Sequence, residues 1–327
     1  MPTIELNEAW TLKQVQGDGY DSHLKQHALS PTLMRILVAL LVLAAAPSLD
    51  GLRAMQALDA RVANVAFRLA SANVASCSRK EPLSGLVLHS LGQYADKDRK
   101  AAAQAFGFAD SPVVLAVADG GPAARAGVRV GDHLLAVGNE RMPEAVAGRA
   151  DMAVVERARS ALKRGLATDA VRLSLRRGTT EFEVSLKSVA GCASLIEMIP
   201  SRKRNALADG EVVQVTSATV AATRDNDELA FVIAHELAHN IKGHYDWLQA
   251  NRRTKANIRK TEVEADSLGI MLMAKAGYDP QAAARFWNHF GGGLSGGILS
   301  DGTHMTKRDR VAFLRAAADR LAKSEAQ

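Results

Sequence analysis

Residues 231–240 contain a His-Glu-x-x-His motif inside an apolar stretch that favours a helix. On a helix, His235 and His239 lie four residues apart and therefore project from one face. Two imidazoles on one face can share a metal ion, and Glu236 can reach a water molecule held there. The motif therefore predicts a zinc site for peptide hydrolysis, with Glu236 as general base. The alternative is a core helix with two hydrogen-bonded histidines.

The flanks of the motif favour a buried helix. Asp225 and the acids that follow it suit the N-cap and first turn of a helix. The apolar residues then recur at the spacing of one buried stripe, at Leu229, Val232, Ile233, Leu237 and Ile241. A zinc site needs ligands that are locked by packing and partly shielded from water, and a buried helix provides both.

A third ligand is expected downstream, because a peptidase zinc site uses three protein ligands and leaves one position open. If the chain turns near residues 249–251, two antiparallel helices of matched length place Glu262 beside the histidine pair. Asp266 lies one turn further on the same face, where it can accept a hydrogen bond from a ligand histidine and fix its ring. Glu264 is predicted to belong to a solvated face.

The sequence His-Glu-Leu-Ala-His, followed by Glu-Val-Glu-Ala-Asp, resembles the gluzincin family of the CAAX prenyl proteases and the HtpX heat-shock peptidase, and its soluble periplasmic members most of all. The resemblance covers about residues 191–327. It implies a mainly helical zincin-type domain with a small sheet and one Zn²⁺ per chain. It also implies that Glu262 is the third zinc ligand and that Asp266 supports a ligand histidine.

Two further histidines lie near these motifs. The family tends to carry Thr-His-Pro near its C-terminus, whereas Met305 follows His304 here. The resemblance implies that His304 reaches the active site, where it stabilises an oxyanion or gates access; the alternative is a histidine of a loop that follows the glycine-rich stretch 291–297. His244 does not have the metzincin spacing, because Tyr245 occupies the position required for a third histidine ligand. We therefore expect His244 on a helix surface or behind the ligands.

The middle of the chain carries a second group of motifs. Residues 120–137 include the segments Pro122-Ala123-Ala124 and Gly131-Asp132, which in PDZ domains open a short helix and turn into the next strand. They resemble a bacterial PDZ domain, and the alternative is an unrelated β-rich insert. Further elements are predicted as strands at 113–117, 171–175 and 182–186, a hairpin turn at Arg177-Gly178, and a helix at 152–166.

The PDZ resemblance implies a groove that binds peptide C-termini by strand addition and holds the terminal carboxylate on backbone amides. Phe106, Gly107 and Phe108 resemble the carboxylate-binding loop of that fold. In the peptidase segment, the predicted strand at 212–216 is expected to pair with an extended substrate. The expected partners are therefore polypeptide substrates, misfolded envelope proteins among them, and peptide termini.

The N-terminus predicts export. An apolar run at 36–46 follows Arg35 and ends in three alanines, which is typical of a signal peptide and short for a membrane span. Residues 1–33 are polar and contain acids, so the true start is expected at Met34, unless 1–33 is an unusual leader. We expect the bacterial periplasm and no stable membrane span; an uncleaved N-terminal anchor is the alternative.

Two cysteines are consistent with an exported protein, since they can form one disulfide in an oxidising compartment. Cys77 follows a helical run and Cys192 precedes the peptidase segment, so a bridge would join the two ends of an inserted domain. Two free buried thiols are the alternative.

The predicted domains are a leader and signal peptide at 1–46, a helix at 47–80 that packs on the peptidase, a PDZ-like domain at 82–190 and the peptidase at 191–327.

The composition excludes other classes. The net charge of +6 is spread among interleaved acids, and aromatic residues make up only 5% of the chain, so nucleic-acid binding is not expected. The sequence therefore predicts an α+β protein that acts as a zinc-dependent endopeptidase on unfolded or flexible segments in the cell envelope, with the PDZ domain recruiting or sensing peptide termini. The alternative is a latent or non-proteolytic chaperone or adaptor that binds peptides on a protease fold.

Overall fold

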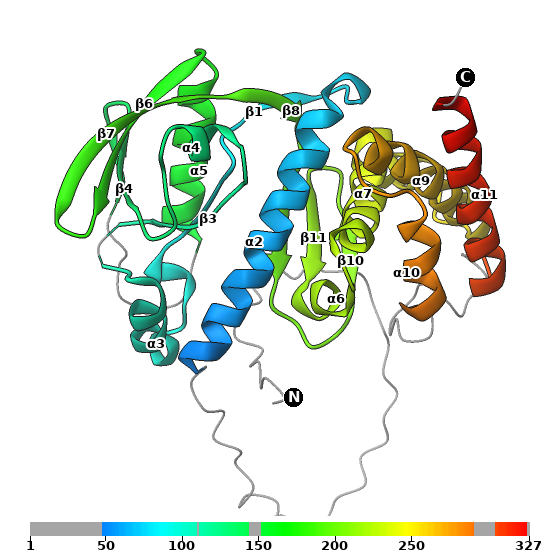
Figure 1. Cartoon of the computed structure of the whole chain (residues 1–327), viewed down its shortest axis with the longest axis horizontal. Coiled ribbons are helices and arrows are strands. Elements are labelled where there is room, and N and C mark those ends of the chain that lie inside the picture. Colours follow the sequence, from blue (N-terminus) through cyan, green and yellow to red (C-terminus); the bar gives the residue numbers. More distant parts are fainter. Residues whose placement is uncertain (1–47, 110, 144–151, 291–304, 326–327) are drawn as a thin grey trace, which may run out of the picture.

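The structure, a computed structural model, describes residues 48–109, 111–143, 152–290 and 305–325. The expected leader at 1–46, the stretch at 291–297 and His304 lie outside the described residues. The described residues form a strand-rich part and a mainly helical part on either side of a long helix (Figure 1). The mixed α+β class predicted from the sequence is confirmed.

The long helix is α2 (Leu49–Ala72), which begins where the side chain of Ser48 accepts a hydrogen bond from an amide of the first turn. Its apolar residues recur every three or four positions and contact both parts of the molecule. Val65 and Leu69 are 0% exposed and belong to the core of the helical part. Leu52 instead packs with an aromatic cluster of the strand-rich part. α2 therefore joins the two cores.

The strand-rich part is an antiparallel sheet in the order β2-β3-β4-β6-β7, with β5 paired to β4. The β6–β7 hairpin turns at Gly178, whose φ of 59° suits glycine. Leu173 and Leu175 on one face of β6 are 0% exposed and pack in a core with residues of α5. The elements are β2 (Leu86–His89), η2 (Leu91–Gln93), α3 (Asp96–Phe106), β3 (Val113–Val117), α4 (Pro122–Arg125), β4 (His133–Val137), β5 (Glu140–Arg141), α5 (Ala153–Leu166), β6 (Ala170–Arg177) and β7 (Thr180–Lys187).

A two-stranded stalk joins the strand-rich part to the rest of the chain. After the short turn η1 (Val74–Ser76), strand β1 (Lys80–Leu83) pairs antiparallel with β8 (Val189–Cys192). Cys77 and Cys192 form the disulfide that the sequence predicted, and both cysteines are buried. The chain therefore leaves the helical part and returns to it at one place, where the disulfide links the two segments.

Loss of this disulfide is expected to destabilise the protein. The bridge spans a sequence separation of 115 residues, and the loss of loop-closure entropy in the unfolded chain limits its contribution to about 4–5 kcal/mol. We expect the double variant Cys77→Ala/Cys192→Ala to unfold at a lower urea concentration, followed by circular dichroism. The wild-type protein measured with a reducing agent should unfold like the variant. Equal midpoints for the oxidised protein and the variant would contradict the expectation.

The helical part contains a small sheet in the order β10-β11-β9, covered by helices (Figure 1). Its central strand β11 runs antiparallel to β10 and parallel to β9. The elements are β9 (Leu195–Ile199), β10 (Ala206–Ala208), β11 (Val212–Thr216), α6 (Ser217–Ala222), α7 (Asn226–Lys242), α8 (His244–Ala250), α9 (Lys255–Lys275), α10 (Ala282–Phe290) and α11 (Lys307–Glu325).

This topology corrects the predicted substrate strand. The residues at 212–216 form β11, and both of its edges are hydrogen-bonded to neighbouring strands. An extended substrate cannot pair with a strand that has no free edge, so that expectation is wrong. Within the described part of the chain, the free edges of this sheet belong to β10 and β9.

No helix in the described ranges combines the length and the apolar character needed to cross a membrane.

Candidate active site

Helix α7 carries the His-Glu-x-x-His motif. It begins as predicted at Asp225, whose side chain accepts a hydrogen bond from the amide of Glu228, and it ends where Gly243 adopts a left-handed conformation. Most of its length is buried, including His235 at 8% exposure. Because the helix is packed into the core, the direction of its two motif histidines is fixed.

Helix α9 packs against α7 and brings the downstream acids to the motif. The predicted reversal near 249–251 is more gradual, since the short helix α8 stands between the two long helices. Gly269 of α9 lies against the backbone of His235, where a Cβ atom would meet two backbone atoms at 3.2 Å. The absence of a side chain at this glycine lets the two helices approach closely beside the site.

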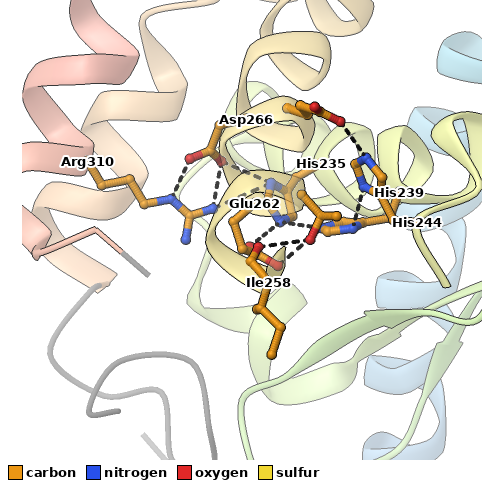
Figure 2. Close-up of polar contacts among 9 residues, drawn as sticks. His235, His239, His244, Ile258, Glu262, Asp266 and Arg310 are labelled. Atoms are coloured by element: carbon orange, nitrogen blue, oxygen red, sulfur yellow. Dashed lines mark hydrogen bonds and ion pairs between the residues drawn. The ribbon is translucent and has the colours of Figure 1, made fainter. Parts of the chain in front are cut away.

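Three side chains predicted as metal ligands converge. The Nε2 atoms of His235 and His239 lie 3.2 Å apart. Oxygens of Glu262 lie 3.3 Å from Nε2 of His235 and 3.4 Å from Nε2 of His239 (Figure 2). The structure thus brings these three donor atoms together from two helices, as the sequence predicted.

The arrangement fits a zinc ion. In a tetrahedral site with bonds of about 2.0–2.1 Å, neighbouring ligand atoms stand roughly 3.3 Å apart. The separation of the two Nε2 atoms and the distance from each to an oxygen of Glu262, Oε2 for His235 and Oε1 for His239, lie within about 0.1 Å of that value. Two imidazoles with one carboxylate are a ligand set that zinc uses in peptidases. Burial, with the charge of His235 adding to it, lowers the pKa of His239 to about 3, which leaves its ring neutral.

A buried acid and a buried arginine hold His235 from behind. Its Nδ1 lies 2.9 Å from Oδ1 of Asp266, as predicted, and Asp266 is itself 0% exposed. Arg310 of α11 binds both oxygens of Asp266, at 2.8 and 2.6 Å (Figure 2). Its guanidinium also stacks 4.0 Å above the ring of Trp287. Burial alone would raise the pKa of Asp266, but Arg310 and the hydrogen bond with His235 hold it below its usual value. The carboxylate therefore stays ionised and fixes the orientation of His235.

His239 has a second support that the sequence did not predict in full. Nδ1 of His244 lies 3.0 Å from Nδ1 of His239 (Figure 2). Nε2 of His244 lies 3.1 Å from Glu264. If Nε2–H of His244 donates a hydrogen bond to Glu264, then Nδ1 of His244 accepts one from Nδ1–H of His239, and Nε2 of His239 is left free to bind a metal. His244 is only 3% exposed, so the helix-surface alternative is wrong. Glu264 is half-exposed but also contacts His244, which corrects the prediction of a merely solvated face.

Glu236 lies beside the donor atoms and lines the same pocket. Burial raises the pKa of this carboxyl to about 7, although the charge of His235 acts in the opposite direction. Burial would lower the pKa of His235, but without a metal the hydrogen bonds with Asp266 and Glu262, together with the charges of both acids, raise it to about 10. A metal bound at His235 would displace that proton. A carboxyl group with a pKa near neutrality can both accept and return a proton at physiological pH.

The pocket in front of these residues has a volume of about 360 Å³. Strand β10 forms one wall with Ala206, Leu207 and Ala208, and the aromatic side chains of α10 form another. β10 is the edge strand of its sheet on this side. An extended peptide can therefore add to β10 and pass over the donor atoms, which is the role the sequence assigned to the neighbouring strand.

The residues predicted as the PDZ carboxylate loop form the end of a helix instead. Gly107 caps α3 with φ 71°, and its amide already donates to the carbonyl of Ala103. Phe106 and Phe108 pack against Tyr94, with ring centroids 6.1 and 5.4 Å away. An amide that is already bonded is not available for a carboxylate, so this segment does not have the open geometry that was expected.

Two parts of the chain match models of known protein families. Residues 193–252 and 247–318 match peptidase family M48, and residues 113–154 match the PDZ domain. Among solved structures, the HtrA3 PDZ domain bound to a phage-derived ligand is 15% identical over 34% of this chain and 89% of its own, with a TM-score of 0.26. The HtrA-type protease AlgW with a decapeptide is 20% identical over 34% of this chain and 30% of its own, with a TM-score of 0.25. Among curated proteins, none matches the chain.

The family match and the three converging donor atoms define the class of protein, which is a zinc metalloendopeptidase. More particularly, the helical part of the chain is similar to peptidases of family M48, and the strand-rich part carries a match to the PDZ domain.

Proposed function

We propose that this metallopeptidase cleaves unfolded or flexible protein segments in the cell envelope, with His235, His239 and Glu262 as zinc ligands and Glu236 as general base. The observation that carries the proposal is the convergence of three donor residues beside Glu236, in a pocket bordered by β10, which is an edge strand among the described strands. A folded substrate could not present an extended segment to β10, so unfolded or flexible chains are preferred.

Each residue has a role in the reaction. His235, His239 and Glu262 would hold the zinc ion, and Asp266 and His244 keep the two histidine rings in place. When bound, zinc supplies Lewis acidity, which lowers the pKa of water and polarises a carbonyl group. The carboxylate of Glu236 takes the proton of the attacking water and then delivers it to the nitrogen of the leaving amine. His304 lies outside the described residues. The oxyanion or gating role proposed for it therefore rests on the resemblance of its motif.

The domain organisation suggests how substrates arrive. We propose that the segment at 47–80 belongs structurally to the peptidase at 191–327, and that the PDZ domain at 82–190 is inserted between them. The buried disulfide at the base of the β1–β8 stalk supports this division and favours an oxidising compartment such as the bacterial periplasm. The PDZ domain would then recruit or sense peptide C-termini of misfolded envelope proteins.

Zinc content and proteolysis of the purified full-length protein test the proposal together. We expect about one zinc per chain by mass spectrometry, together with zinc-dependent cleavage of casein. Glu262→Gln should lose most of the metal, because the variant keeps the shape of the side chain but replaces the anionic ligand by a neutral amide. Glu156→Gln, an exposed acid of α5, is the matched control and should keep both zinc and activity.

Other results would separate the alternatives. Zinc without casein cleavage would favour a latent protease or a peptide-binding adaptor on the same fold. A folded protein without zinc, or a Glu262→Gln variant with full metal content, would contradict the proposed site.

A further inference from the structure

A second cavity, of about 1150 Å³, lies between the two parts of the molecule. Its walls are one face of α2, strand β2 and helix α5 of the strand-rich part, and strand β9 of the helical part. Among the residues that the structure describes, none that lines it also lines the active-site pocket. It is therefore a separate site, formed jointly by residues inside and outside the PDZ domain.

Two free strand edges border this cavity. Among the described strands, β2 ends the PDZ sheet and β9 ends the small sheet of the peptidase. PDZ domains bind an extended peptide by adding it as a strand to such an edge. A peptide that adds to β2 here has β9 and α2 close to its other side. Half-buried Ile196 and Met198 of β9 supply apolar surface for its side chains.

The charges in the cavity are unbalanced. The described lining residues include two basic side chains, and both are paired: Arg159 lies 3.3 Å from Glu197, and Lys163 lies 2.8 Å from Glu81. Asp59 of α2 has no basic partner in the described part of the chain. Burial, with the charge of Glu197 adding to it, raises the pKa of Asp59 to about 8. An acid in this environment gains strongly from a cationic partner.

A second acid on the cavity wall, Asp98, also favours a ligand with donor groups. Asp98 of α3 is only 3% exposed, and among the described residues its Oδ1 has no hydrogen-bond partner. A buried polar atom without a partner costs free energy unless a ligand or water satisfies it. Asp98 therefore provides an observation, independent of Asp59, that the cavity is suited to a ligand with donor groups.

We propose that the cavity is a composite peptide site, which binds the C-terminal segment of a polypeptide between β2 and β9 and selects for a lysine or arginine through Asp59. The inference rests on the proposed binding of peptide termini by the PDZ domain, but not on the catalytic roles of the active-site residues. It assigns part of the specificity to residues outside the PDZ domain, because Asp59 lies on α2 and β9 belongs to the peptidase.

The site also connects the bound terminus to the active site. The sheet that presents β9 to this cavity presents β10, its opposite edge, to the active-site pocket. One substrate chain can therefore be held by its terminus on one edge of the sheet and be cleaved beside the other edge.

Peptide affinities of the full-length protein test the inference. The probes are labelled decapeptides that end in a free valine carboxylate, in which one lysine is moved through the six preceding positions of an alanine background. Fluorescence anisotropy is measured in a Glu236→Gln background, which prevents cleavage. We expect lysine at one or two positions to tighten binding about tenfold, since a hydrogen bond to a charged group is worth about that much. Asp59→Asn should reduce this preference to about twofold or less.

The controls separate the two levels of the proposal. Asp119→Asn removes an exposed acid that does not line the cavity and should preserve the lysine preference. Binding that weakens when the C-terminal carboxylate of the peptide is amidated would support the PDZ role. If such binding shows no lysine preference, or if the preference persists in Asp59→Asn, the composite site is overturned while the PDZ role stands. If no peptide binds, both fail. Neither outcome depends on zinc content or on casein cleavage.

Discussion

Glu236→Gln is expected to lower kcat/KM for casein by about 10²–10⁴-fold without removing zinc, because general acid–base catalysis contributes a factor of that size. Glutamine has nearly the same shape as glutamate but cannot accept a proton from water at neutral pH. Glu236 lines the pocket beside the predicted metal ligands, but it takes no part in the close contacts among His235, His239 and Glu262. The loss should therefore fall on the chemical step and spare metal binding.

The matched control is Glu211→Gln, which alters a side chain that is 81% exposed. It should retain both rate and metal. Zinc content and cleavage rates are measured on the same preparations, so that a loss of metal is not mistaken for a loss of catalysis. If the activity of Glu236→Gln falls only in proportion to its zinc, Glu236 acts as a structural residue of the site. An unchanged rate would rule it out as the base.

The parts of the site that could be predicted from the sequence depend on short-range geometry. His235 and His239 share a face because they are four residues apart on a helix, and this holds wherever the helix packs. Glu262 and Asp266 are likewise one turn apart on α9. Once the two helices are paired, their acids meet the histidines with little freedom. The disulfide was predictable because its two cysteines flank a separately recognisable domain.

Arg310 was missed because nothing local marks it. It lies 44 residues from Asp266 on the C-terminal helix, among charged residues that are exposed. A buried arginine among exposed neighbours is recognisable only when the packing of α11 against α9 is known. The same limit explains the substrate strand, because β10 and β11 are both plausible edges until the strand order of the sheet is known.

His244 shows a different limit. The spacing between His239 and His244 correctly excluded His244 as the third zinc ligand of a metzincin. The spacing could not show that Gly243 breaks the helix and turns His244 back toward His239. The prediction of a carboxylate-binding loop at 106–108 was wrong for a related reason. An apolar-Gly-apolar triplet suits both an open loop and a helix end, and Gly107 is the C-cap of α3.

Arg310→Met is expected to destabilise the folded protein by about 3–5 kcal/mol and to weaken zinc binding by about 10–100-fold. The side chains of Arg310 and Asp266 are 3% and 0% exposed, so the variant leaves a carboxylate buried without its bidentate partner. Methionine keeps much of the apolar contact with Trp287 but supplies no charge. Asp266 would then hold His235 less firmly. Urea unfolding of the metal-free protein and competition with a zinc chelator measure the two effects separately.

The matched control is Arg308→Met on the same helix, where the side chain is exposed and the change should stay within about 0.5 kcal/mol. The two measurements also decide what Arg310 does. If it only fills space, the variant loses stability but binds zinc as tightly as the wild type. If it fixes Asp266 and thereby His235, zinc affinity falls as well, and Arg310→Met/Asp266→Asn restores part of the stability without restoring the affinity. The second pattern follows from the chain of contacts from Arg310 through Asp266 to the ring that holds the metal.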